Sequence, residues 1–181
     1  MGQSKLLLPL KGQPIIRHCI DPLISSVIKD IVVVLRSGDT ELIHAVNGLP
    51  VHIVFNTISG SDMADSVRTG LSAVDEASTG ILISLADQPL VSLDTIKMLV
   101  AYHNREPEKI LIPQYKKKKG HPVVFPRNLL QDIFDGGILR DIIKKYSGRT
   151  GLLPVDDEGI ILDIDLPEDY RDIQVKIGDV R

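Results

Sequence analysis

Ile81-Leu82-Ile83-Ser84-Leu85-Ala86-Asp87-Gln88-Pro89 is the stretch that decides the fold of this 181-residue chain. Its apolar half is typical of a buried strand, and the acidic residue and the proline indicate where that strand ends. Ligands of open α/β sheets bind in the crevice beyond the carboxyl ends of the strands. Asp87 is therefore well placed to hold a metal ion against a phosphate, although an Asp before Gln-Pro is also typical of a turn or a helix cap.

Short apolar segments rich in Val and Ile alternate with segments of helical spacing through the first two thirds of the chain. The predicted strands are residues 31–35, 51–55, 81–85 and 110–112, and the predicted helices are residues 14–27, 40–46, 62–74 and 93–102. Nearly continuous apolar runs of this length are typical of parallel strands buried on both faces. The alternation predicts an α/β layered sheet, and the chain length predicts one domain, residues 1–181.

The pattern changes after residue 113. A lysine-rich turn followed by an apolar run predicts a hairpin arm rather than another strand and helix. Beyond it we expect a helix opened by Pro126, a helix at residues 138–146, strands at residues 152–155 and 160–164, and a last helix that begins at Pro167.

Composition excludes several classes of function. A net charge of −3 argues against a nucleic-acid surface, and the lysine cluster at residues 116–119 is typical of a solvated hairpin. Cys19 is the only cysteine, which excludes an internal disulfide and a multi-cysteine metal site. The apolar runs are shorter than a membrane span, and the first residues do not resemble a signal peptide, so we expect a cytoplasmic protein with no membrane partner.

A second acidic cluster follows the predicted strand at residues 160–164. Strand alternation places Asp163 and Asp165 on the same face. Carboxylates from two separate strand ends could share Mg²⁺ bridging a triphosphate, which would neutralise charge during nucleotidyl transfer. A simpler alternative, compatible with the first, is that Asp165 caps the helix beginning at Pro167.

Several motifs occur in a characteristic order. They are Met1-Gly2, Lys5, the segment Leu7-Leu8-Pro9-Leu10-Lys11-Gly12-Gln13-Pro14, Asn56, then Met63, Ser66, Arg68, Gly70 and Leu71, the segment Leu85-Ala86-Asp87-Gln88-Pro89-Leu90-Val91, Gly120-His121-Pro122-Val123-Val124-Phe125, and Asp163-Ile164-Asp165-Leu166-Pro167-Glu168-Asp169-Tyr170. In this order the chain resembles the molybdenum cofactor cytidylyltransferases of the MobA-like nucleotidyltransferase group.

The resemblance implies a Rossmann-like three-layer α/β/α nucleotidyltransferase fold with a mostly parallel sheet. It implies a Mg²⁺-dependent enzyme that transfers CMP from CTP to molybdopterin cofactor, releases pyrophosphate, and has a molybdoenzyme as a further partner. Asp87 and Asp165 would bind the metal, and Lys5 would act with Asp87 in catalysis and bind the nucleotide phosphates. The implied nucleotide and substrate site comprises Gly2, Lys5, Asn56, Ser66, Gln88, Pro89, Gly120 and His121.

The chain departs from the family pattern at its start. Met1-Gly2 corresponds to the end of the family's glycine-rich phosphate loop, and the strand before that loop has no counterpart. Loss of a central strand predicts unpaired strand edges inside the fold. We therefore expect a shortened form, arising from a misplaced start codon, a truncated expressed form or a decayed gene.

The sequence determines the acceptor substrate and the nucleotide base less firmly than it determines the type of reaction. The loop at residues 57–62 has Thr57 and Ser59 where the family has a proline and an aromatic residue, and Asp62 where the family has a glycine. A guanylyltransferase using GTP, a transferase for another small molecule, and a catalytically impaired cofactor-binding or delivery protein for a molybdoenzyme therefore remain alternatives.

Overall fold

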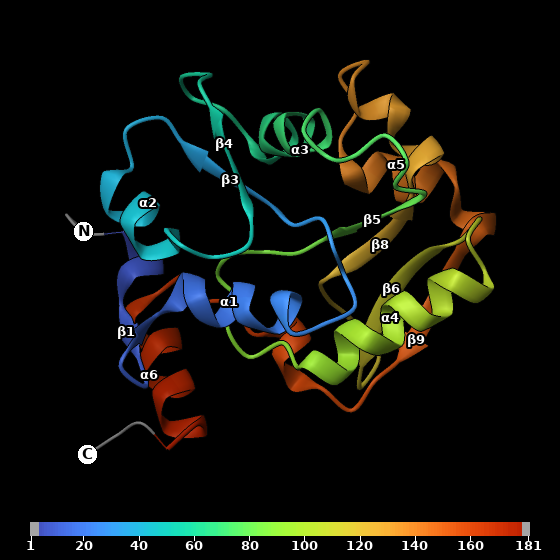
Figure 1. The fold of residues 1–181 in the computed structure, drawn as a ribbon. Helices are drawn as coiled ribbons and strands as arrows, with labels where there is room; N and C mark the ends of the chain where they lie inside the picture. Colours follow the sequence, from blue (N-terminus) through green and yellow to red (C-terminus); the bar gives the residue numbers. More distant parts are fainter. Residues whose placement is uncertain (1–3, 179–181) are drawn as a thin grey trace.

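Helices cover both sides of the strands in the computed structural model, which describes residues 4–178. The helices α1 (Ile15–Ile24) and α4 (Leu93–Arg105) lie on one side, and α3 (Met63–Leu71) and α5 (Leu139–Lys145) lie on the other (Figure 1). This arrangement confirms the predicted three-layer α/β class. Each of the four helices expected in the first two thirds of the chain is present, with ends shifted by a few residues.

The strands form two separate main sheets. They are β3 (Val32–Arg36) and β4 (His52–Asn56) in one sheet, and β5 (Gly80–Ile83), β8 (Val123–Pro126), β6 (Ile110–Tyr115), β7 (Lys118–Lys119) and β9 (Thr150–Pro154) in the other. The pairs β3–β4 and β6–β9 are parallel, whereas β8 runs antiparallel to both β5 and β6. The four predicted strands and the hairpin arm are confirmed, but β5 pairs with the antiparallel β8 rather than with a parallel neighbour.

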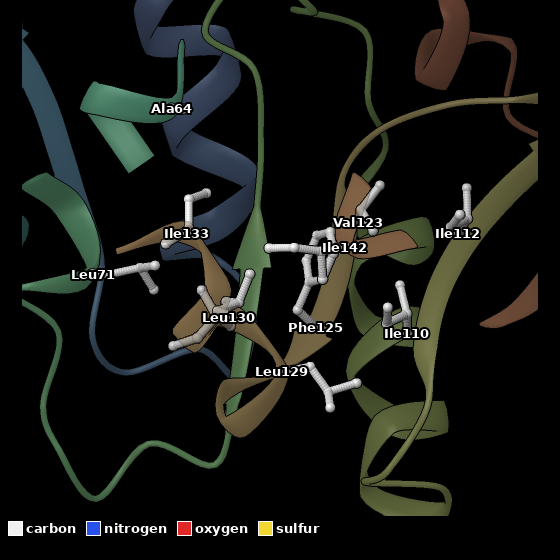
Figure 2. Close-up of a cluster of buried hydrophobic side chains, with 11 residues drawn as sticks. Ala64, Leu71, Ile110, Ile112, Val123, Phe125, Leu129, Leu130, Ile133 and Ile142 are labelled. Carbon is white, nitrogen blue, oxygen red and sulfur yellow. The ribbon is translucent and has the colours of Figure 1, made fainter. Parts of the chain in front are cut away.

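Consecutive apolar residues in β8 point to opposite faces of the sheet. Val123 and Phe125 belong to one buried cluster, whereas Val124 packs with Leu99 of α4 and Leu111 of β6 in another. Figure 2 shows the first cluster, in which side chains of the segment after β8 and of α3 and α5 gather around the strands. Because both faces are covered by helices, the strands read as continuous apolar runs rather than as an alternating pattern.

The remaining elements are short or terminal. They are η1 (Lys5–Leu7), β1 (Pro9–Leu10), β2 (Gln13–Pro14), α2 (Thr40–Val46), the 3₁₀ helices η2 (Arg127–Ile133), η3 (Ser147–Arg149) and η4 (Glu158–Ile161), and α6 (Pro167–Lys176). The helix expected after Pro126 is therefore a 3₁₀ helix, while α6 begins at Pro167 as predicted. No helix among residues 4–178 has the length and apolarity that crossing a membrane requires.

The predicted strand at residues 160–164 is wrong. The Asp157 side chain accepts a hydrogen bond from the Gly159 backbone N–H at 2.9 Å and caps η4, so this segment begins as a tight helical turn. Its last part is held by the Ile164 N–H, which donates to the carbonyl of Asp87 at 3.0 Å. The local cap and isolated long-range bonds replace the ladder that the apolar residues suggested.

The expected unpaired edges are present between β3 and β5. Among the described residues β3 pairs only with β4, and β5 pairs only with β8. Residues of both strands line one cavity of about 720 Å³. The two sheets are thus separate between β3 and β5.

Candidate active site

Lys5 lies between two carboxylates that come from distant parts of the chain. Its Nζ donates to Asp87 Oδ2 at 2.9 Å and to Asp165 Oδ1 at 2.8 Å. The side chains of Lys5 and Asp87 are 33% and 24% exposed, whereas that of Asp165 is 66% exposed. The three residues that the sequence singled out for catalysis and metal binding therefore meet in one partly open cluster, which we call the Lys5 cluster.

Two local features position the carboxylates. Asp87 lies four residues after the end of β5, at the carboxyl edge of that strand. Its backbone carbonyl accepts the hydrogen bond from the Ile164 N–H. That bond brings Asp165 to the same edge. Asp169 Oδ2 in turn accepts from the backbone N–H groups of Asp165 and Leu166, at 3.0 and 2.6 Å.

The alternative role of Asp165 as a helix cap is wrong. The carboxylate that binds the free N–H groups before α6 belongs to Asp169, and the Asp165 side chain is directed to Lys5. Sequence reasoning did not identify this function of Asp169. An acidic residue three positions into a Pro-led helix was the available signal, because this position can reach back to the residue before the helix.

Charge within the Lys5 cluster favours the protonated lysine. Partial burial lowers the pKa of Lys5, but the hydrogen bonds and charges of Asp165 and Asp87 outweigh it and leave that pKa above its usual value. Lys5 is therefore fully cationic at neutral pH. It is a compact positive charge that occupies the position between two anionic oxygen ligands.

Two other titratable groups are influenced by Asp87. Burial and the negative charge of Asp87 raise the pKa of the Cys19 thiol to about 12, and its Sγ donates to the Ala86 carbonyl at 3.1 Å. Burial lowers the pKa of His121, and Asp87 partly opposes this effect. At neutral pH Cys19 is an unreactive thiol of the core, and His121 is a neutral imidazole.

Close backbone packing holds the segment that carries His121. The His121 N–H donates to the Ile160 carbonyl at 3.0 Å, and the Gly120 N–H donates to the Pro113 carbonyl at 3.0 Å. A Cβ added to Gly120 would lie 2.1 Å from the Ile160 oxygen. Only glycine permits this approach, which explains the residue type beside His121.

Gln88 and Pro89 are buried directly after Asp87. Gln88 is 6% exposed, and its side-chain Oε1 has no hydrogen-bond partner among the described residues. Buried amide oxygens usually accept a hydrogen bond. Gln88 Oε1 follows Asp87 of the Lys5 cluster in the chain, and it could accept a hydrogen bond from a donor group of a ligand.

Asn56 and Ser66 form a pair of their own. Asn56 Nδ2 donates to Ser66 Oγ at 3.2 Å, and Asn56 Oδ1 accepts from the Ile58 N–H at 3.0 Å. Their described contacts join β4 to the start of α3 and do not include the Lys5 cluster. Gly2, the remaining predicted site residue, lies outside the described residues.

The donor set limits the kind of metal that fits. Within residues 4–178 no group of three or more His, Cys, Asp or Glu side chains could hold a metal ion. Two carboxylates sharing one cation fit Mg²⁺, which keeps several waters and uses one or two carboxylates together with substrate phosphates. The Lys5 ammonium shows that both oxygens can contact a single positive centre.

Asp169→Ala is expected to lower the free energy of unfolding by about 1 kcal/mol, because two backbone N–H groups lose their shared acceptor. The freed segment should also weaken Mg²⁺ binding about tenfold, since Asp165 loses its support. Urea denaturation and calorimetric Mg²⁺ titration would measure both effects. The neighbouring exposed Glu168→Ala is the control, and equal effects of the two variants would contradict the role of Asp169.

Comparisons with known proteins identify the family of this chain. The model of the MobA-like NTP transferase domain matches residues 1–149. Over 184 residues the chain is 30% identical to the purine catabolism protein PucB of Bacillus subtilis (strain 168), covering 94% of this chain and 87% of PucB.

Solved structures show the same fold. Rv0371c of Mycobacterium tuberculosis H37Rv superposes with a TM-score of 0.80 at 26% identity, covering 96% of this chain and 89% of that one. A nucleotidyl transferase from Methanothermobacter (Mth528) superposes with a TM-score of 0.83 at 21% identity, covering 98% and 86%. These likenesses confirm the predicted nucleotidyltransferase-like α/β fold.

Proposed function

This chain belongs to the MobA-like NTP transferase domain family, and from that premise we propose that it transfers CMP from CTP to molybdopterin cofactor. In this reaction a phosphate oxygen of the acceptor attacks the α-phosphorus of the nucleotide. The new P–O bond forms as the bond between the α-phosphorus and the bridging oxygen breaks, and pyrophosphate leaves. In-line transfer of this kind requires positioning and charge neutralisation more than proton transfer.

The observation that carries the proposal is the position of Lys5 between Asp87 and Asp165. This cluster is partly open and lies beyond the end of β5. The crevice beyond strand ends is the usual ligand site of α/β sheets.

The two carboxylates would hold a divalent metal, and Lys5 would contact the nucleotide phosphates. Bound Mg²⁺ would neutralise the charge that develops around the transferring phosphorus. Lys5 stays protonated across the physiological range, because its pKa is raised, and it can donate to phosphate oxygens. In support of a divalent ion, Rv0371c has also been solved in complex with manganese.

The other residues implied by the family resemblance would orient the two substrates. Gln88 offers an unmatched Oε1, and His121 presents a neutral imidazole that can donate or accept a hydrogen bond without adding charge. Asn56 and Ser66 would contribute from the β4 and α3 side. The Leu85 to Val91 and Gly120 to Phe125 segments resemble the cytidylyl branch, which favours CTP over GTP.

A second candidate is a binding or delivery protein for a molybdoenzyme that keeps the fold without turnover. The ion pairs of Lys5 with both Asp87 and Asp165 favour it, because they neutralise the two carboxylates without a metal ion.

Pyrophosphate release separates the candidates. The purified chain would be incubated with Mg²⁺, molybdopterin cofactor and either CTP or GTP, with equilibrium binding of each nucleotide measured in parallel. Release with CTP supports the proposal, and release with GTP alone supports the guanylyl alternative. Binding of the cofactor without release in either assay would replace the proposal with the delivery function, and absence of both would reject the two candidates.

A further inference from the structure

The segment at residues 157–165 runs beside the connection at residues 87–92, which leads from the Lys5 cluster to the start of α4. At one end of this contact the Ile164 N–H donates to the Asp87 carbonyl at 3.0 Å. At the other end the Asp157 carboxylate binds the residues where the connection enters α4. The connection that carries Asp87 is therefore held at both ends by a single segment.

Asp157 uses both of its carboxylate oxygens. Oδ2 accepts from the Ser92 N–H at 2.9 Å and from the buried Thr95 hydroxyl at 2.7 Å. Oδ1 accepts from the Gly159 N–H at 2.9 Å. Hydrogen bonds to an ionised group are roughly twice as strong as those between neutral groups. The carboxylate thus ties the start of α4 to the start of η4, and a neutral amide, which has only one oxygen, could not accept all of these bonds.

Close backbone packing joins the middle of the two segments. A Cβ added to Gly159 would lie 2.1 Å from the Leu90 oxygen and 2.8 Å from the Val91 nitrogen. Only glycine permits this approach, and no side chain separates the two backbones. A shift of η4 relative to α4 would therefore also move the connection between them.

The same segment holds two further residues of the candidate site. The Ile160 carbonyl accepts from the His121 N–H at 3.0 Å, and Asp165 Oδ1 accepts from Lys5 Nζ at 2.8 Å. Asp157 stands at the start of this segment, and its bonds to α4 set where the segment begins. Groups that orient ligand-binding side chains from behind affect a site without touching its ligand.

From these contacts we propose that Asp157 is a positioning residue of the candidate active site: by fixing η4 against the start of α4, it sets the place of Asp87 relative to Lys5 and Asp165. The effect of Asp157 on catalysis rests on the proposed nucleotidyl transfer, whereas its effect on the Lys5 cluster does not. A residue that only caps α4 would stabilise that helix and leave the Lys5 cluster unchanged.

Asp157→Asn separates these two roles when it is compared with Ser92→Ala. The first variant keeps the shape of the side chain but loses the charge and one acceptor. The control removes the hydroxyl that caps α4 by accepting from the Thr95 N–H at 3.2 Å, but it keeps the backbone N–H that Asp157 binds. Both variants weaken the start of α4, so both should unfold at lower denaturant concentration. Thr95→Val removes one donor to Asp157 and serves as a milder second variant.

Two NMR signals report on the candidate site in the chain without substrate or metal. They are the hydrogen exchange of the Ile164 amide, measured against the amides of β8, and the ammonium nitrogen signal of Lys5. In Asp157→Asn we expect about tenfold faster exchange of Ile164 and a displaced Lys5 signal, with smaller changes in Thr95→Val and none in Ser92→Ala. Pyrophosphate release should fall about tenfold in Asp157→Asn and stay within about twofold of the parent chain in Ser92→Ala.

The proposal is overturned if Asp157→Asn leaves both NMR signals unchanged, or if Ser92→Ala moves them equally. Displaced signals with unchanged pyrophosphate release would overturn it as well, because Asp157 would then not affect the reaction. If the parent chain itself releases no pyrophosphate, the proposed transfer fails, and the two NMR signals still decide whether Asp157 positions Asp87.

Discussion

Asp87→Asn is expected to reduce pyrophosphate release at least a hundredfold, because the variant keeps the shape of the side chain but loses the charge that the proposed metal requires. A metal bound between carboxylates contributes several kcal/mol to charge stabilisation in the transition state, and each 1.4 kcal/mol corresponds to a tenfold change in rate. Mg²⁺ affinity, measured by calorimetry, should fall at least tenfold in the same variant.

Stability should change little in Asp87→Asn. Lys5 keeps its bond to Asp165, and the partly exposed pair that is lost is of a kind worth about 0–1 kcal/mol. Asp163→Asn is the matched control, since this exposed carboxylate lies in the same acidic segment as Asp165. If the two variants release pyrophosphate and bind Mg²⁺ equally well, Asp87 is not a metal ligand.

Gly120→Ala is expected to lower the free energy of unfolding by about 3 kcal/mol, because its Cβ would lie 2.1 Å from the Ile160 backbone oxygen. A backbone atom cannot turn aside as a flexible side chain does. The segment must therefore shift, and the hydrogen bond from the His121 N–H to the same oxygen must lengthen. Chemical denaturation followed by circular dichroism measures the loss.

Gly148→Ala is the control for this prediction. No atom lies within 4 Å of a Cβ added there, and the backbone is not in the left-handed region. Its stability should stay within about 0.5 kcal/mol of the parent chain. A Gly120→Ala variant as stable as this control would contradict the close approach to Ile160.

Sequence patterns predicted the strands well where both faces of the strand are buried. The runs that became β5 and β6 are apolar because both of their faces pack into buried clusters, and such runs are readable without knowing their partners. The pairing of β5 was not readable, since parallel and antiparallel partners of a buried strand require the same apolar residues. The antiparallel β8 between β5 and β6 emerged only from the structure.

The candidate site residues were predicted through the family resemblance together with the rule that ligand sites follow strand ends. This identified Lys5, Asp87 and Asp165, which the structure brings into contact. The predicted strand before Asp165 was wrong, because apolar residues in a 3₁₀ turn are as buried as those in a strand. The cap considered as an alternative role for Asp165 belongs to Asp169, because both residues lie near the start of α6 and only side-chain direction distinguishes them.

The sequence by itself determined the layered α/β class, the positions of the main strands and helices, and the acidic residues at their ends, because burial and turn chemistry are encoded locally. The tertiary structure decided how these parts meet. The bond from Ile164 to Asp87 brings Asp165 to Lys5, and the separation of β3 from β5 leaves a cavity between unpaired edges. Such contacts join residues far apart in the chain, so their geometry depends on how all the layers pack.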